Sequence, residues 1–255
     1  MRIREYSIET KKLNTDLKIC LISDLHSRGY KKCLNAIKSV GADLIICAGD
    51  MLERLDGYRD EENTQGFEFL SLVSKLVPTY YAFGNHERFG SHKEAKKRAV
   101  GAVEVTLENS KKLDDTGVTV VNEIYCEYLK NNTKILIGGL MSADDTRNEV
   151  PNIKFAEEFS KQNGYKILIS HQPEYYDNYL RNYDLDLIVS GHTHGGQWKL
   201  FGRGVYAPNQ GLFPKYFSGL YDAKLIVSAG ASNPEKFIPR IFNPCEIVII
   251  NIKSV

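Results

Sequence analysis

The sequence predicts an α/β protein, and two observations support this class. Short apolar runs of β-type composition alternate along the chain with stretches in which apolar residues recur every three or four positions. These are the periodicities of strands and of amphipathic helices. Polar clusters stand directly after several of the apolar runs. Because ligands of α/β sheets bind outside the carboxyl ends of the strands, this layout also predicts one shared site.

The expected elements follow in chain order from the two periodicities. The apolar runs predict strands at residues 17–23, 44–48, 79–83, 135–139, 166–169, 187–190, 225–228 and 246–252. Apolar positions at helical spacing predict helices at residues 31–39, 65–76, 93–99, 153–162 and 174–181. No Pro-, Ser- or Gly-rich linker and no break in composition divides the chain, so we expect a single domain over residues 1–255.

Charge and apolar content exclude several classes of protein. Of the 255 residues, 42% are hydrophobic and the formal net charge is +1, without a long basic run. This balance gives no electrostatic footprint for nucleic acid, so no nucleic-acid partner is expected. No stretch approaches the length of an apolar membrane span, and the N-terminal residues lack the apolar region of a signal peptide. We therefore expect a cytoplasmic protein.

The cysteines point to the same compartment. They are odd in number, scattered, and form no CxxC pair: Cys20, Cys33, Cys47, Cys126 and Cys245. Cys20 and Cys47 stand within apolar strand-like runs, where cysteine behaves as a small hydrophobic residue. Buried, reduced thiols and a reducing compartment are expected.

Five of the six histidines stand in the polar clusters that follow expected strands. An isolated histidine is more often a hydrogen-bonded structural residue than a ligand, so it is the combination that indicates a site. The sixth, His92, opens a lysine-rich stretch and is expected at the surface. The clusters combine histidine, aspartate and asparagine: Asp24 and His26; Asp50; Asn85 and His86; His171; His192 and His194.

These residue types suit a metal site. Asp, His and Asn supply oxygen and nitrogen donors and no thiolate, a mixture that suits Mn, Fe or Zn. Asp24 and His26 are separated by one residue. Residues spaced in this way lie on the same side of an extended chain end, so both side chains can face one ion. The sequence therefore predicts a transition-metal site in which Mn, Fe and Zn are all open.

The motifs occur in a characteristic order. They read Asp24-Leu25-His26, Gly49-Asp50, Gly84-Asn85-His86-Glu87, His171 and Gly191-His192-Thr193-His194. This series resembles the calcineurin-like metallophosphoesterase superfamily, whose motifs are D-x-H, G-D, G-N-H-E, H and G-H-x-H in the same order. The resemblance implies a four-layer α/β/β/α sandwich, in which two central mixed β-sheets pack face to face with helices outside.

The resemblance also implies a ligand set and a reaction. The ligands would form two triads and one bridge: Asp24, His26 and His194; Asn85, His171 and His192; and the bridging Asp50. A hydroxide that bridges the two divalent ions would attack the phosphorus of a phosphate ester or pyrophosphate. His86 would stabilise the transition state or protonate the leaving oxygen. Two divalent ions and two carboxylates leave a charge of about +2, which suits an anionic phosphoryl group.

For the acidic residues beside the ligands the sequence leaves two roles open. Glu53 stands three positions after Asp50, where relatives often carry Asp, and we expect it either behind the ligands or at the surface. Glu87 either orients His86 or a metal-bound group, or has a structural role alone. Glycines precede several ligands, where we expect sharp turns at strand ends: Gly49, Gly84 and Gly191.

Segments in the C-terminal part of the sequence relate it to one bacterial branch of this superfamily. The segment 191–197, followed by residues 227–230 and 243–247, is similar to the bacterial branch that contains YkuE-type and YaeI-type enzymes and the pyrophosphatases of UDP-diacylglucosamine. Members of that branch often begin with a membrane anchor or export signal, and this N-terminal sequence shows neither.

Residues 198–221 are rich in aromatic residues without helical or strand periodicity, which predicts a long loop.

The expected function is that of a dinuclear metal-dependent phosphodiesterase or phosphatase. Its substrate would be a small phosphorylated compound or a lipid-linked phosphate, and no obligate protein partner is evident. For residues 198–221 we expect either aromatic packing onto the domain or a peripheral contact with an anionic membrane. A metallo-nuclease and a non-catalytic scaffold on the same fold are the alternatives. The net charge argues against the first and the intact motifs argue against the second.

Overall fold

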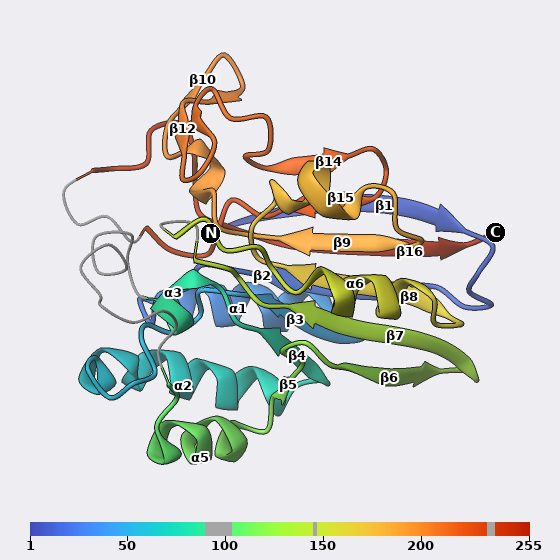
Figure 1. The fold of residues 1–255 in the computed structure, drawn as a ribbon, viewed down its shortest axis with the longest axis horizontal. Helices are drawn as coiled ribbons and strands as arrows, with labels where there is room; N and C mark the ends of the chain where they lie inside the picture. Colours follow the sequence, from blue (N-terminus) through green and yellow to red (C-terminus); the bar gives the residue numbers. More distant parts are fainter. Residues whose placement is uncertain (90–103, 145–146, 234–237) are drawn as a thin grey trace.

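The computed structural model describes residues 1–89, 104–144, 147–233 and 238–255. Two mixed six-stranded sheets dominate it (Figure 1). The first sheet has the strand order β1 (Arg2–Thr10), β16 (Glu246–Ser254), β2 (Leu17–Ile22), β3 (Leu44–Ala48), β4 (Thr79–Ala82) and β5 (Thr119–Val120). The second has the order β14 (Gly219–Tyr221), β15 (Leu225–Val227), β9 (Leu187–Ser190), β8 (Tyr165–Ser170), β7 (Thr133–Leu140) and β6 (Tyr125–Lys130).

Each sheet contains a run of parallel strands and at least one antiparallel pair of strands. In the first sheet, β2, β3 and β4 are parallel and β16 is antiparallel to β2. In the second, β7, β8, β9 and β15 are parallel, while the outer strands β6 and β14 are antiparallel to their neighbours. The parallel strands of one sheet end at a common edge, so the loops that follow them meet there.

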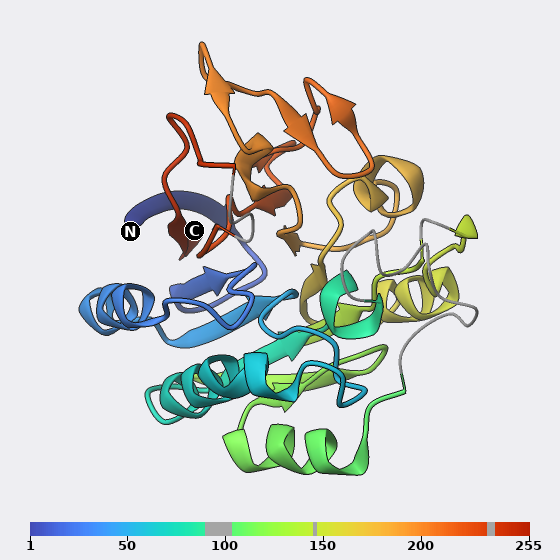
Figure 2. The ribbon, with the colours of Figure 1, turned by 90° about the vertical axis from the view of Figure 1, so that its left-hand side faces the viewer.

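Helices cover the outer face of each sheet. Helices α1 (Lys31–Val40), α2 (Asp60–Ser74) and α5 (Leu107–Thr116) pack on the first sheet. Helix α6 (Ile153–Ser160) and the π-helix η2 (Tyr176–Leu180) pack on the second. Figure 2 shows α1, α2 and α5 on one side of the sheets and α6 on the other. The predicted four-layer α/β/β/α sandwich is confirmed.

The apolar runs are continuous because each central strand faces two cores. In β2, Ile19 and Leu21 point into the core between the sheets, whereas Cys20 and Ile22 point toward the helices. In β8, Ile167 and Ile169 face the same inter-sheet core. Side chains of a strand alternate between its faces, so a strand covered on both faces needs apolar residues at every position. Burial of each such side chain contributes about 1.5–3 kcal/mol.

All of the expected strands are present, within two residues of the predicted bounds. Residues 31–39, 65–76 and 153–162 overlap α1, α2 and α6, and residues 174–181 contain the π-helix η2. The expected helix at residues 93–99 and the position of His92 lie outside the described residues. Within the described ranges, no helix is long and apolar enough to cross a membrane.

The periodicity missed elements that bury little apolar surface. Strands β1 and β6 are outermost in their sheets, and their residues alternate between exposed and half-buried positions. Helix α5 buries Leu113 but is otherwise mostly polar; Thr106 caps its start by accepting a hydrogen bond from the Asn109 N–H, and Gly117 ends it with φ 76°. Elements of this kind depend on their neighbours more than on an apolar pattern of their own.

Candidate metal centre

The loops after the parallel strands hold their polar residues in unusual backbone conformations. Asp24, His26, Asp50, His192 and His194 have φ values of 55°, 50°, 53°, 71° and 48°. This left-handed region costs a non-glycine residue roughly 1–3 kcal/mol, and such strain gathers at functional sites. The backbone at these positions therefore costs conformational free energy, which packing elsewhere in the fold offsets.

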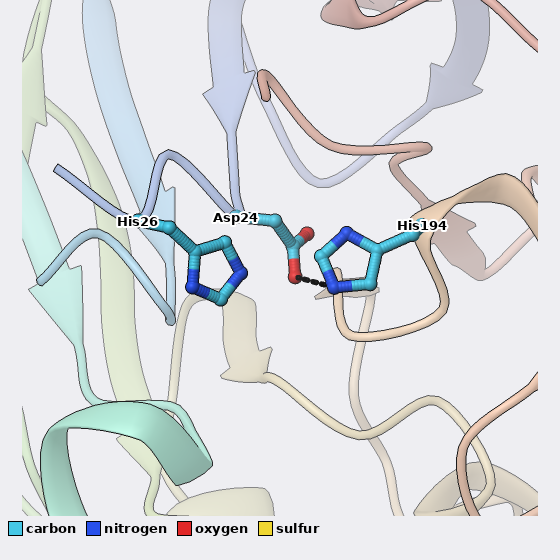
Figure 3. A group of neighbouring side chains, drawn as sticks. All are labelled: Asp24, His26 and His194. Carbon is cyan, nitrogen blue, oxygen red and sulfur yellow. Dashed lines mark ion pairs between the residues drawn. The ribbon is translucent and has the colours of Figure 1, made fainter. Parts of the chain in front are cut away.

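The first group of side chains consists of Asp24, His26 and His194. Their candidate ligand atoms all lie within 4.8 Å of one another. Oδ1 of Asp24 is 3.8 Å from Nε2 of His194, and the rings of His26 and His194 have centroids 5.3 Å apart. Figure 3 shows the Asp24 carboxylate directed toward His194, with the His26 ring on its other side. The structure thus brings together the three residues of the first expected triad.

The second group contains Asp50, His171 and His192, whose candidate ligand atoms also lie within 4.8 Å of one another. Oδ2 of Asp50 is 3.1 Å from Nε2 of His171. Asn85 lies beside this group, since its Oδ1 is 2.8 Å from Nδ1 of His192. The residues of the second expected triad are therefore adjacent.

The Asp50 carboxylate connects the two groups. Its Oδ2 lies 3.1 Å from Nε2 of His171 in the second group and 3.9 Å from Nε2 of His26 in the first. Its Oδ1 accepts a hydrogen bond from the backbone N–H of His86 at 2.8 Å. One oxygen of a single buried carboxylate thus faces both sets of histidines.

The donor atoms fit divalent metal ions. Asp24, Asp50, His26 and His171 are at most 1% exposed. Both ring nitrogens of His26 and Nε2 of His171 nevertheless lack a hydrogen-bond partner. Buried polar atoms without partners are rare in folded proteins and require an explanation. A metal ion in each group would satisfy one ring nitrogen of His26 and Nε2 of His171, while Nδ1 of His26 faces Oε1 of Glu53 at 3.4 Å. The oxygen and nitrogen donors suit Mn, Fe or Zn.

The protonation states of His192 and His194 agree with this assignment, whereas that of His171 does not: burial lowers its pKa, but the carboxylates of Asp50 and Asp24 raise it to about 10, so His171 would release a proton on ligating an ion. Burial lowers the pKa of His192 to about 3 and holds the pKa of His194 well below its ordinary value, so both rings are neutral at pH 7. A histidine must be neutral to ligate a metal. Burial acts to raise the pKa of Asp50, but the charges of His171 and His86 outweigh it and hold that pKa well below the ordinary value. Asp50 is therefore ionised.

His86 lies beside the two groups and is bound to a carboxylate. Its Nδ1 is 2.7 Å from Oε2 of Glu53, and its side chain is 18% exposed. The other oxygen of Glu53 is 3.4 Å from Nδ1 of His26. Burial lowers the pKa of His86, but the carboxylates of Asp50 and Glu53 raise it to about 9. These two carboxylates therefore favour the protonated form of the His86 ring.

Glu53 is the residue whose expected position was left open. It is 4% exposed, so a surface position is wrong and a position behind the ligands is correct. The backbone N–H of Glu53 donates to Oδ1 of Asn63 at 2.8 Å, and this hydrogen bond holds the loop between β3 and α2 in place. Glu53 also forms a third candidate ligand group with His26 and His86.

Glu87 has a structural role rather than a contact with the His86 ring. Its carboxylate accepts hydrogen bonds from the backbone N–H groups of Asp50, Leu52 and Gly84 at 3.1, 3.0 and 2.9 Å, and from the hydroxyl of Tyr81. Glu87 is fully buried. It therefore ties the loop after β3 to the loop after β4, the two loops that carry Asp50 and the Asn85 helix α3 (Asn85–Phe89).

The glycines before the ligands are needed for space as well as for turns. Gly49 has φ 83°, as expected for a sharp turn. Gly84 and Gly191 have no such φ, but a Cβ on Gly84 would lie 2.2 Å from Oδ1 of Asp50, and one on Gly191 would lie 2.6 Å from Oδ2 of Asp24. At these two positions the close approach of the carboxylates requires glycine, and at Gly191 the chain also turns sharply, because the Thr193 N–H donates to the Gly191 carbonyl at 2.8 Å.

Two polar residues of the site carried no sequence signal. Nη2 of Arg240 lies 3.3 Å from Nδ1 of His194, and its guanidinium also donates to the carbonyl groups of Ala229 and Ser232. Nδ2 of Asn209 lies 3.1 Å from Nε2 of His192. Both residues stand in irregular segments without a motif, so no pattern could identify them.

Comparison with known proteins gives one family. A sequence profile described as calcineurin-like phosphoesterase matches residues 17–196. An uncharacterised metallophosphoesterase of Campylobacter jejuni is 28% identical over 99% of this chain and 63% of its own length. A metallophosphoesterase of Caenorhabditis elegans is 27% identical over 98% of this chain and 52% of its own length. The chain thus spans about half to two thirds of these two relatives. A UDP-2,3-diacylglucosamine pyrophosphatase of Chlamydia muridarum is 24% identical over 92% of this chain and 83% of its own length.

Proposed function

The chain belongs to the calcineurin-like phosphoesterase family, and we propose that it hydrolyses a phosphate ester or pyrophosphate with the help of two divalent metal ions. The observation that carries this proposal is the position of Asp50, whose Oδ2 faces His26 on one side and His171 on the other. A carboxylate placed in this way can be shared by two ions, an arrangement that suits two-metal hydrolysis.

The remaining donors divide between the two ions as follows. Asp24, His26 and His194 would hold one ion, and the second would be held by Asn85, His171 and His192. Bound in these groups, the ions would supply a hydroxide nucleophile and neutralise charge on the phosphoryl oxygens. Asn85 is neutral, which keeps the positive charge of the site higher than a third carboxylate would.

His86 is placed to complete the reaction. The hydrolysis adds the oxygen of one water molecule to phosphorus and breaks the bond from phosphorus to the leaving oxygen, which must gain a proton unless it is a stable anion. His86 is partly exposed, its Nδ1 lies 2.7 Å from Oε2 of Glu53, and the carboxylates of Glu53 and Asp50 favour the protonated ring. The other ring nitrogen, Nε2, is then the proton donor to the leaving oxygen.

The substrate class follows from charge and from the relatives. We propose a small phosphorylated compound or a lipid-linked phosphate. The pyrophosphatase of Chlamydia muridarum acts, by its name, on a diacylated nucleotide sugar, and it is similar to this chain over most of both lengths.

A hydrolysis screen tests the proposal. The protein is stripped with a chelator, reloaded with Mn, Zn or Fe in turn, and assayed on a monoester, a diester, a dinucleotide and a lipid-linked nucleotide sugar diphosphate. We expect metal-dependent release of phosphate or of a phosphorylated product, absent in Asp50→Asn. A protein that binds two equivalents of each metal and hydrolyses none of these compounds would instead be a scaffold.

A further inference from the structure

The loop after the metal ligands exposes large apolar side chains on two hairpins. The first hairpin pairs β10 (Lys199–Leu200) with β11 (Arg203–Gly204), and the second pairs β12 (Tyr206–Ala207) with β13 (Gly211–Leu212). Both project from the same side of the molecule (Figures 1 and 2). Phe201 in the first hairpin is fully exposed and Phe213, directly after the second, is 66% exposed; Phe242, in the segment before β16, is 81% exposed. Packing onto the domain therefore does not explain these side chains, although it does explain Tyr216, which is buried.

The same three phenylalanines have strained backbones. Phe201, Phe213 and Phe242 have φ values of 49°, 54° and 53°. A bulky residue in the left-handed region is an outlier, because glycine occupies this conformation without steric cost. Each position thus combines a strained backbone with an apolar ring in water. At Phe201 the two-residue turn with Gly202, whose φ is 80°, accounts for the backbone conformation. It is the exposed rings that indicate a surface covered by something else.

A basic groove of about 690 Å³ adjoins two of these phenylalanines. Its lining contains three cationic side chains and no acidic residue, and its apolar wall consists of Leu200, Phe201, Phe217 and Phe242; the cations are Arg2, Arg4 and Lys199. Behind the groove, Glu246 pairs with Arg4 at 3.0 Å. Nζ of Lys199 is 2.7 Å from Oγ of Ser218 and lies above the Phe217 ring. Burial, together with the neighbouring arginines, lowers the pKa of Lys199 to about 8. The groove therefore favours an anion.

We propose that this groove and the adjoining side chains of Leu200, Phe201 and Phe242 form a docking surface for a bilayer that contains anionic phospholipid. The phosphate of a headgroup would lie between Arg2 and Lys199. The rings of Phe201 and Phe242 would enter the interfacial region, where apolar burial and attraction to anionic lipid add. The pairing of protruding apolar rings with a cationic groove distinguishes a bilayer from a small soluble phosphate, which would need only the groove.

The docking surface is connected to the metal centre. The Lys199 N–H donates to the carbonyl of Ile241, and Arg240 next to it reaches His194. Docking would therefore hold the metal centre close to the bilayer surface, within reach of a lipid-linked phosphate. This last consequence rests on the proposed function, whereas docking itself does not, because it can be measured on vesicles that contain no substrate.

Co-sedimentation of the full chain with vesicles tests the proposal. We expect it to pellet with an equal mixture of phosphatidylcholine and phosphatidylglycerol, more weakly with phosphatidylcholine alone, and more weakly at high salt. Phe201→Gly and Phe242→Gly should each reduce binding by about tenfold. These changes relieve backbone strain, so a normal melting temperature is expected and loss of binding cannot be attributed to misfolding. Arg2→Gln and Lys199→Gln should each reduce binding to anionic vesicles by about fivefold.

Leu107→Ser is the matched control, because Leu107 is 92% exposed and lies at the start of α5, away from the two hairpins. It should bind vesicles as the wild type does. A wild-type protein that stays in the supernatant with anionic vesicles, or an equal loss in Leu107→Ser, would overturn the proposal. Self-association that is lost in Phe201→Gly, without vesicle binding, would assign the surface to a second copy of the chain instead.

Discussion

The Glu53 carboxylate contacts two histidines with its two oxygens: Oε2 lies 2.7 Å from Nδ1 of His86, and Oε1 lies 3.4 Å from Nδ1 of His26. His26 belongs to the first ligand group, whereas His86 stands at the edge of the site. A single buried side chain therefore orients both a candidate ligand and the candidate acid. Carboxylates behind histidine ligands commonly fix the tautomer and orientation of the ring.

Glu53→Gln should lower turnover about 10–100-fold. Glutamine keeps the size of the side chain but removes the negative charge that stabilises the protonated His86 ring. The decisive measurement compares substrates with poor and good leaving groups, because only the former need the proton. Glu53→Asp keeps the charge and should recover part of the activity. A uniform loss for all leaving groups, with normal metal content, would contradict this positioning role.

His86→Asn should lower turnover about 10²–10⁴-fold while the protein retains its metals, as expected for a residue that donates a proton without ligating. The loss should be smaller with nitrophenolate as leaving group, because nitrophenolate is stable as an anion. Steady-state kinetics on two substrates measure the loss of turnover, and metal analysis of the same preparation shows whether the metals are retained. Loss of one metal equivalent would show that His86 is a ligand.

Asp50→Asn should remove most of the activity and weaken binding of both metal ions. Its carboxylate faces both histidine groups, whereas each other expected ligand serves one ion. The metal content of the purified variant gives the measurement, with Asp24→Asn as the comparison, which should weaken one ion more than the other. Two full equivalents and wild-type turnover in Asp50→Asn would refute a shared carboxylate.

Gly84→Ala should disable the centre although it adds a single methyl group. The new Cβ would lie 2.2 Å from Oδ1 and 2.7 Å from the backbone N of Asp50, and the backbone atom cannot move aside. Overpacking of this kind costs about 1–3 kcal/mol in the free energy of unfolding. Gly138→Ala is the control, because its Cβ would meet the Phe159 ring at 3.2 Å, away from the metal centre. Metal content should fall in the first variant and remain normal in the second.

Binding to anionic vesicles should weaken as the pH rises from 7 to 9. The pKa of Lys199 is lowered to about 8 by burial, with Arg4, Arg2 and Arg240 contributing and Glu246 opposing. Lysine is cationic below its pKa, so the groove loses one positive charge over this range while its arginines keep theirs. The affinity should fall about fivefold. Lys199→Arg stays charged and should show little pH dependence; an equal pH dependence in this variant would mean that another group titrates.

Local sequence determined most of the layered fold. The apolar runs at residues 17–22 and 165–170 face one core with odd-numbered residues and another with even-numbered residues, so their composition alone predicts buried central strands. The polar clusters after these strands were equally visible, because a strand end is a local feature. Strands β1 and β6 escaped prediction, since an outer strand buries few side chains and leaves a weak apolar signal.

The sequence by itself thus determined which strands are buried on both faces and which residues stand at their ends. Through the order of the motifs, it also determined the family. Only the tertiary structure decided that Glu53 reaches His86, that Arg240 lies beside His194, and that Phe201 and Phe242 remain in water. The physical reason is that periodicity records whether a side chain faces a core. Contacts between irregular segments depend instead on backbone conformations, such as the left-handed residues of these loops, that are stabilised by the packing of the two sheets.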